Sequence, residues 1–147
     1  LDRPGPFAVE VREERKTDPA LLGAPVAATR LLGRFNAGGG TVRAEELAAP
    51  RAVAFDASRM SRVELRIPER KCLDVGAAIG PGGSGVDVRL VDAQTQSELA
   101  LARGTFATVA RACAGTSARP IAVELRLDVG KADGLVAANT RDEQPTK

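Results

Sequence analysis

The sequence predicts an all-β fold, an antiparallel β-sandwich or barrel, with one short helix near the N-terminus. Several segments of the second half alternate apolar and polar residues with a period of two, as strands with one buried face do. Segments rich in glycine, proline or small polar residues separate them. No long helical pattern lies between these segments, which argues against a fold of alternating strands and helices.

The length of 147 residues favours one domain. We expect three parts: an N-terminal extension with a short helix over residues 1–40, the β-sandwich domain over 41–141, and a flexible tail over 142–147. The tail is polar and contains proline, and terminal segments of this kind tend to fray.

The first 60 residues are less regular than the rest. Residues 7–12 and 52–56 have the composition of strands. Asp18 followed by Pro19 is typical of a helix start. The strongest helical signal is a set of four apolar residues spaced i, i+3, i+4 and i+7, namely Ala28, Leu31, Leu32 and Phe35. Three glycines at 38–40 are expected to end this helix.

Strands dominate after residue 60. The clearest is 121–129, in which five aliphatic residues alternate with Glu124, Arg126 and Asp128. The other expected strands are 62–67, 72–79, 86–91, 98–102, 106–113 and 135–141. The intervening turns are 80–85, expected to be a hairpin, then 92–97, 114–120 and 130–134. Charged residues that alternate with aliphatics, such as Asp74, Asp87 and Asp128, should face water.

The chain contains two cysteines, Cys72 and Cys113. An even count fits a single disulfide, which we expect to join the two layers of the sandwich; two buried free thiols are the alternative. Closing a loop of this length stabilises a fold by about 4 kcal/mol on the chain-entropy view. A disulfide would indicate an oxidising compartment, namely the periplasm, the cell surface or the outside of the cell.

Charge and hydropathy exclude some partners. With 21 basic and 19 acidic residues the net charge is only +2, so we do not expect nucleic acid binding. No run approaches the roughly 18 apolar residues of a transmembrane segment. No signal peptide is visible, but the chain begins with Leu1 rather than Met, so we expect a mature form or a fragment.

The side chains argue against an enzyme. The sequence has no His, Trp or Tyr, so histidine-based catalysis and His-ligated metal sites are excluded. Ser84, between Gly83 and Gly85, superficially resembles a nucleophile turn, but that motif leads into a helix and this one leads into a predicted strand. We therefore expect no cofactor and no catalytic residue. The four phenylalanines are expected to pack in the core.

Two loops are the candidates for contact with a ligand or partner, because binding residues concentrate on loops. One contains Gly82, Gly83 and Ser84, and the other contains Asp92, Gln94 and Gln96. In the second loop, side chains with oxygen atoms occur at every second position. A calcium site that includes Asp92 and Glu98 is therefore an alternative. The position-six glycine and most acidic residues of a calcium loop are missing, so a solvated turn is preferred.

The order of these strands resembles bacterial pre-peptidase C-terminal-type domains over about residues 49–141. The resemblance rests on the aliphatic strand before residues 72–75, the glycine loop, the element with Asp87, Leu90 and Asp92, and the later strand before Gly130. It implies a small secreted β-sandwich, jelly-roll-like, appended to exported proteins, without a common activity. In this chain Gly115 is followed by Thr116 where the family often carries Tyr.

These observations predict a non-catalytic, exported bacterial module that binds other protein domains or components of the cell envelope. The alternative is a structural or assembly subunit that forms an oligomer through strand edges or through the N-terminal helix. The sequence does not name a ligand.

Overall fold

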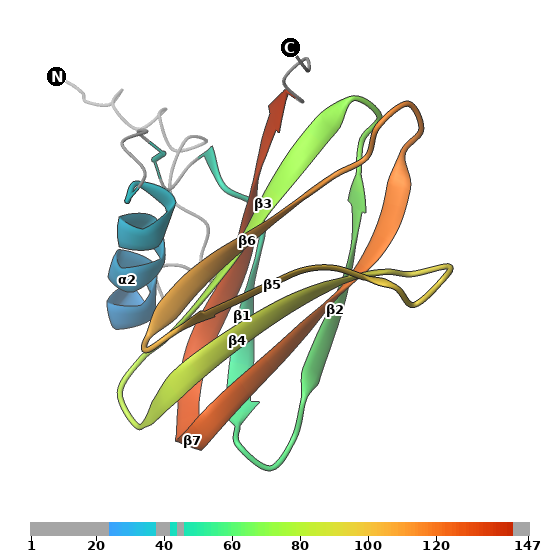
Figure 1. Cartoon of the computed structure of the whole chain (residues 1–147). Coiled ribbons are helices and arrows are strands. Elements are labelled where there is room, and N and C mark those ends of the chain that lie inside the picture. The colour runs from blue at the N-terminus through green and yellow to red at the C-terminus, as the bar shows by residue number, and fades with distance from the viewer. Residues whose placement is uncertain (1–23, 38–41, 44–45, 143–147) are drawn as a thin grey trace, which may run out of the picture.

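A computed structural model of the chain describes residues 24–37, 42–43 and 46–142. The predictions for residues 7–12, Asp18, Pro19 and 38–40, and for Phe7, lie outside the described residues. The described part consists mostly of antiparallel strands with one short helix, as the sequence predicts (Figure 1). Its elements are α2 (Pro25–Phe35), β1 (Ala48–Asp56), β2 (Ser61–Ile67), β3 (Lys71–Ile79), β4 (Gly83–Asp92), β5 (Glu98–Gly104), β6 (Ala107–Cys113) and β7 (Arg119–Asp142).

The long strand β7 organises the whole sheet. Its first half, 119–130, pairs with β2 on one side and β4 on the other, and β5 extends this part beyond β4. Its second half, 131–142, pairs with β1 and β3, and β6 extends this part beyond β3. The sheet therefore curls so far around one core that it is nearly barrel-shaped.

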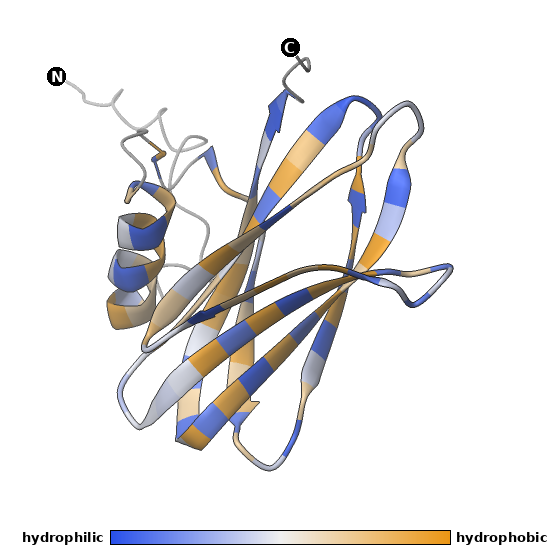
Figure 2. Ribbon diagram, viewed as in Figure 1, coloured by the Kyte–Doolittle hydropathy of each residue, from blue (hydrophilic) through white to orange (hydrophobic). Residues whose placement is uncertain are grey.

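The core follows from the alternation in the sequence. Figure 2 shows apolar and polar residues alternating along β4 and along the first half of β7. Three aliphatic residues of that half, Ile121, Val123 and Leu125, are almost fully buried, whereas Val129 near its end is 62% exposed. The three buried residues pack against residues from both halves of the sheet, including Val75 and Val88. Burial of such aliphatic side chains contributes about 1.5–3 kcal/mol each.

Helix α2 covers the outer side of β3 and β6. Pro25 occupies its first turn, where a missing N–H costs nothing, and Ala27 and Leu31 are buried against the sheet. Gly76 of β3 leaves room for the helix, because a Cβ there would lie 2.8 Å from Leu31 Cδ1. As a result β3 is buried on both faces rather than on one.

Two predicted turns are wrong. Residues 130–134 do not form a turn but belong to β7, which bends at Gly130 with φ of 87°. The segment 80–85 is not a hairpin, because β3 and β4 do not pair and belong to different parts of the sheet. In addition, β4 already begins at Gly83. At both places a glycine lies where the chain passes from one half of the sheet to the other.

Three further expectations need correction. The Cys72–Cys113 disulfide is present, but it joins directly opposed residues of the neighbouring strands β3 and β6 rather than two layers. Asp74 does not face water but is buried. Phe106 is exposed, with the Arg30 guanidinium 4.3 Å from its ring centre, whereas Phe55 is in the core. The outer faces of the sheet are thus more structured than alternation alone predicts.

Candidate functional site

The two predicted contact loops lie at opposite ends of β4. Gly83 begins this strand and Asp92 ends it. At about 3.4 Å per residue, the ten residues of the strand separate the two loops by roughly 30 Å. The structure therefore does not bring the two sets of candidate residues together into one site.

Tight packing accounts for the glycines of the first loop. A Cβ on Gly82, whose φ is 115°, would lie 2.5 Å from the carbonyl oxygen of Lys131. A Cβ on Gly83 would lie 2.8 Å from a methyl group of Leu127. Ser84, the next residue, pairs with Val129 within the sheet. The absence of side chains at Gly82 and Gly83 allows the connection between β3 and β4 to pass close to the bend of β7.

Asp92 holds the second loop together. Its carboxylate accepts hydrogen bonds from the backbone N–H groups of Gln94 and Thr95, at 2.8 and 3.0 Å, and forms an ion pair with Arg119 at 3.3 Å. The hydrogen bond from Thr95 N–H, then that from Gln94 N–H, hold the pKa of Asp92 below its usual value. By accepting hydrogen bonds from the backbone two and three residues later, the Asp92 carboxylate closes the turn that begins at Asp92.

Gln94, Gln96 and Glu98 do not join Asp92 in a common site. The Gln96 side chain donates to the carbonyl oxygen of Ala93 at 3.0 Å, and Gln94 is exposed. Glu98 accepts a hydrogen bond from Arg89 Nε at 2.8 Å. Within the described ranges no group of three or more His, Cys, Asp or Glu side chains could hold a metal ion. Asp92 and Glu98 thus have partners of their own within the chain.

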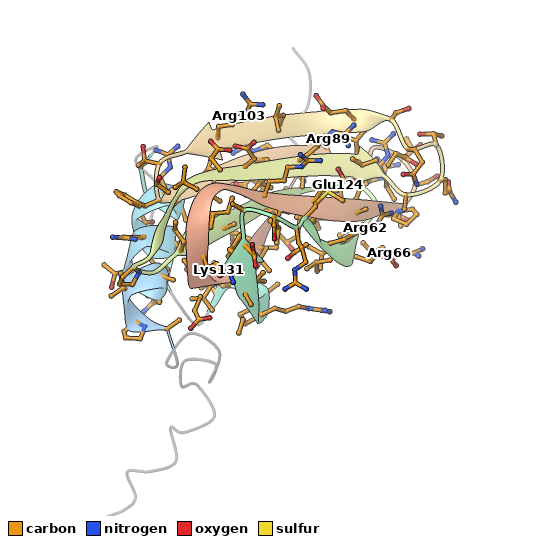
Figure 3. The ribbon with its side chains drawn as sticks, turned by 90° about the horizontal axis from the view of Figure 1, so that it is seen from below. Arg62, Arg66, Arg89, Arg103, Glu124 and Lys131 are labelled. Carbon is orange, nitrogen blue, oxygen red and sulfur yellow. A yellow bond between two sulfur atoms is a disulfide. The ribbon has the colours of Figure 1, made fainter. Side chains whose placement is uncertain are left out.

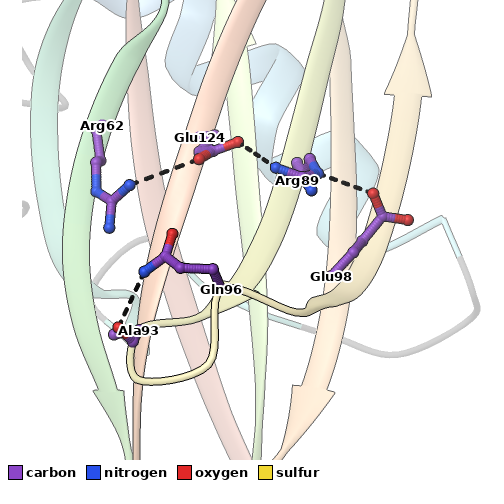
Figure 4. Close-up of polar contacts among 6 residues, drawn as sticks. All are labelled: Arg62, Arg89, Ala93, Gln96, Glu98 and Glu124. Carbon is purple, nitrogen blue, oxygen red and sulfur yellow. Dashed lines mark hydrogen bonds and ion pairs between the residues drawn. The ribbon is translucent and has the colours of Figure 1, made fainter.

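The most organised polar surface is the outer face of β2, β4, β5 and the first half of β7. Here Arg62, Glu124, Arg89 and Glu98 form a continuous chain across four strands (Figure 4). The contacts are 3.6 Å from Arg62 to Glu124, 2.7 Å from Arg89 to Glu124, and 2.8 Å from Arg89 to Glu98. Hydrogen bonds to Glu98 and Glu124 raise the pKa of Arg89.

A second row of charges runs beside the first. Asp87 of β4 is the register partner of Arg126 on β7 and of Arg103 on β5. Its carboxylate lies 3.4 Å from Arg103, whereas Arg126 makes no ion pair with any residue of the described part of the chain. We call the two rows together the charged face: Arg62, Asp87, Arg89, Glu98, Arg103, Glu124 and Arg126. In Figure 3, Arg103, Arg89, Glu124 and Arg62 come from successive strands of this face.

The charged face is hollowed by two shallow depressions. The first, of about 300 Å³, is bounded by β4, β5 and β7 and includes Leu101 in its lining. The second, of about 400 Å³, reaches to the turn between β1 and β2 and includes Met60. Both are lined by Asp87 and Arg126, so they adjoin at these two residues. We call these two neighbouring depressions together the trough.

A separate cluster lies on β3, β6 and β7 away from this face. Buried Asp74 is bound by Arg111 Nε at 2.6 Å and by Arg141 Nη1 at 3.3 Å. The hydrogen bond to Asp74 raises the pKa of Arg111. Three strands contribute to this cluster, beside the disulfide, and its contacts join them.

The charged face could not be predicted from the alternation of residues, which shows that these charges point outward but not which of them meet. The signal was present in the spacing of Arg62, Glu124 and Arg89, each at an outward position of its strand. What connects them is the register, which places both Arg62 and Arg89 opposite Glu124. Register across three strands that are distant in sequence cannot be obtained from the alternation within each one.

Comparison with known proteins found no match, either to any protein-family model or to any curated protein. Among the residues that the structure describes, no helix has the length and apolar character needed to cross a bilayer.

Proposed function

We propose that this chain is a non-catalytic β-sandwich module, jelly-roll-like, of an exported bacterial protein, and that it acts by contact with other protein domains or with components of the cell envelope. The resemblance to pre-peptidase C-terminal-type domains and the disulfide between Cys72 and Cys113 support export. The contact surface in this proposal is the charged face.

One observation carries the proposal: the charged face is an ordered array on an open sheet surface. Arg89 is held by Glu124 at 2.7 Å and by Glu98 at 2.8 Å, and Arg62 adjoins this row at 3.6 Å from Glu124. A preorganised surface loses less conformational entropy on binding than a disordered one. The carboxylates of this array are bound to arginines, an arrangement that suits recognition better than proton transfer.

Assembly through strand edges is less well supported than contact through the charged face. The register of β1 slips between Ala48 and Arg51, where Pro50 lacks an N–H to donate. The strands β2, β5 and β6 are edges of the sheet as well. Each exposes arginine, namely Arg62 and Arg66 on β2, Arg103 on β5 and Arg111 on β6. Proline, irregularity and charge are the features that prevent edge-to-edge pairing. Helix α2 already buries Leu31 against the sheet, so its apolar face is occupied. We therefore expect a monomer by light scattering.

The proposal is tested by co-sedimentation of the purified, oxidised chain with bacterial envelope fractions. We expect saturable binding that is weakened by salt, because exposed ion pairs are screened. In parallel, the same preparation is assayed with ester, glycoside, peptide and phosphoester substrates. Turnover that co-purifies with the chain and disappears when it is unfolded would show an enzyme and overturn the proposal.

A further inference from the structure

Starting from the proposed function, we infer that the charged face binds an acidic protein segment in extended conformation, one whose carboxylates are interspersed with apolar side chains. The segment would lie in the trough formed by the two depressions. This inference rests on three features: which charges are outermost, which of them lack a strong partner, and where the apolar side chains lie.

In most ion pairs of the charged face the arginine is more exposed than its carboxylate, although the total charge of the face is nearly balanced. In the pair of Arg103 with Asp87, the arginine side chain is 71% exposed and the carboxylate only 15%. In the pair of Arg62 with Glu124 the values are 38% and 12%. Glu98 is the exception, because its side chain is 47% exposed against 39% for Arg89. A partner that approaches over Arg103 and Arg62 meets guanidinium groups first, with Asp87 and Glu124 beneath them. Charge complementarity therefore favours an acidic partner.

The arginines differ in how much bonding capacity they have left. Arg89 is engaged by Glu98 and Glu124 at 2.8 and 2.7 Å, so it is part of the scaffold. Arg62 and Arg103 hold their carboxylates at 3.6 and 3.4 Å, beyond ordinary hydrogen-bond length. Arg126 holds none within the described residues. Arg126, Arg103 and Arg62 can thus bind incoming carboxylates, for which the guanidinium fork is well suited.

The spacing of these arginines suits a segment with several separate carboxylates. Arg126 and Arg103 flank Asp87 on the strands at either side of β4. Two strand spacings place their backbones about 10 Å apart. Carboxylates two or three residues apart in an extended segment are separated by about 7–10 Å. Each arginine can therefore receive its own carboxylate.

Apolar side chains at both ends of the trough favour a protein segment over a uniform polyanion. Leu101 in the first depression is 44% exposed, and Met60 in the second is 42% exposed. They offer contact to apolar side chains of the partner. Asp128 and Asp87, which line the second depression, would repel an unbroken series of phosphate or sulfate groups.

The test uses the full oxidised chain and a labelled peptide of sequence Leu-Ser-Glu-Ser-Glu-Ser-Leu, with binding measured by fluorescence anisotropy. In an extended conformation its two Glu and both terminal Leu face the same side. We expect the double variant Arg103→Glu/Arg126→Glu to weaken binding by about tenfold or more. The matched control is Arg51→Glu, an exposed arginine of β1 outside the face, which should change affinity by less than about twofold. Leu101→Ser should weaken binding severalfold. Circular dichroism confirms folding, and the milder Arg103→Gln/Arg126→Gln pair provides a second comparison.

Three outcomes would overturn the inference. The first is no binding of the peptide by the wild-type chain. The second is an equal loss in the Arg51→Glu control. The third is tighter binding of dextran sulfate that Leu101→Ser does not affect, which would indicate a polyanion surface. Envelope co-sedimentation of the same variants separates this inference from the proposed function: retained binding by the double variant would contradict the acidic-segment site while leaving a contact module in place.

Discussion

Asp92 shows how one side chain can close a turn and make it sensitive to pH. Its carboxylate is buried, yet it accepts two backbone N–H groups and faces Arg119. These contacts favour the charged form, which is why its pKa lies below the usual value of about 3.9. An unfolded chain lacks these contacts, so its Asp92 titrates at the ordinary value.

This difference predicts a pH dependence of stability. Because the folded-state pKa is the lower one, the contribution of Asp92 is complete above about pH 4 and is lost as pH falls through the folded-state pKa. The Asp92→Asn variant keeps an oxygen acceptor but cannot titrate. We expect its unfolding midpoint to fall less than that of the wild type on acidification. Thermal unfolding followed by circular dichroism from neutral to acidic pH checks this, and parallel curves would contradict it.

At Gly130 the conformation of the backbone requires glycine. Its φ of 87° lies in the region that side chains rarely adopt, and a Cβ there would clash with the carbonyl oxygen of Gly82. We expect Gly130→Ala to lower the free energy of unfolding by about 2 kcal/mol or more. Gly33→Ala is the control, because that glycine lies within α2 with open space around it, and it should stabilise by up to about 1 kcal/mol. Urea denaturation measures both; a neutral Gly130→Ala would show that the bend does not need glycine.

At the scale of elements, helix α2 packs with one face on β3, β6 and β7. Leu31 is fully buried between the helix and the sheet, next to Ala78 and Leu135. We expect Leu31→Ala to cost about 2–4 kcal/mol, because it leaves a cavity. Val26→Ala, an exposed position of the same helix, should cost much less. Equal effects of the two substitutions on urea unfolding would contradict the packing of α2 on β3.

The elements also show how far sequence reasoning reaches. Alternation within a strand predicted 62–67 closely and 121–129 as part of the longer strand β7, and the spacing of Leu31 and Phe35 predicted the helix, because both patterns are local. The bend of β7 at Gly130 resembled a turn, since glycine serves in both. The burial of Asp74 could not be predicted, because it depends on Arg111 and Arg141 arriving from other strands. The candidate site was missed for the same reason: register between distant strands creates the charged face.

At the scale of the whole molecule, the disulfide closes a long loop. Cys72 and Cys113 are 41 residues apart and lie at facing positions of β3 and β6, so the bond restrains most of the segment containing β4 and β5. On the chain-entropy view we expect the Cys72→Ser/Cys113→Ser variant to lose about 4 kcal/mol of stability. Denaturation of the wild type with and without reductant should reproduce the loss. A difference below about 1 kcal/mol would contradict a stabilising role for the bond.

The central claim is that the molecule acts by contact through the charged face. Nuclear magnetic resonance of the isotope-labelled chain, titrated with detergent-solubilised envelope proteins, tests it most directly. The account predicts that shifted or broadened amide signals cluster on β2, β4, β5 and the first half of β7, around Arg103 and Arg126. Signals that change on β1, β3 and β6 instead, or a spectrum that does not change at all, would contradict it.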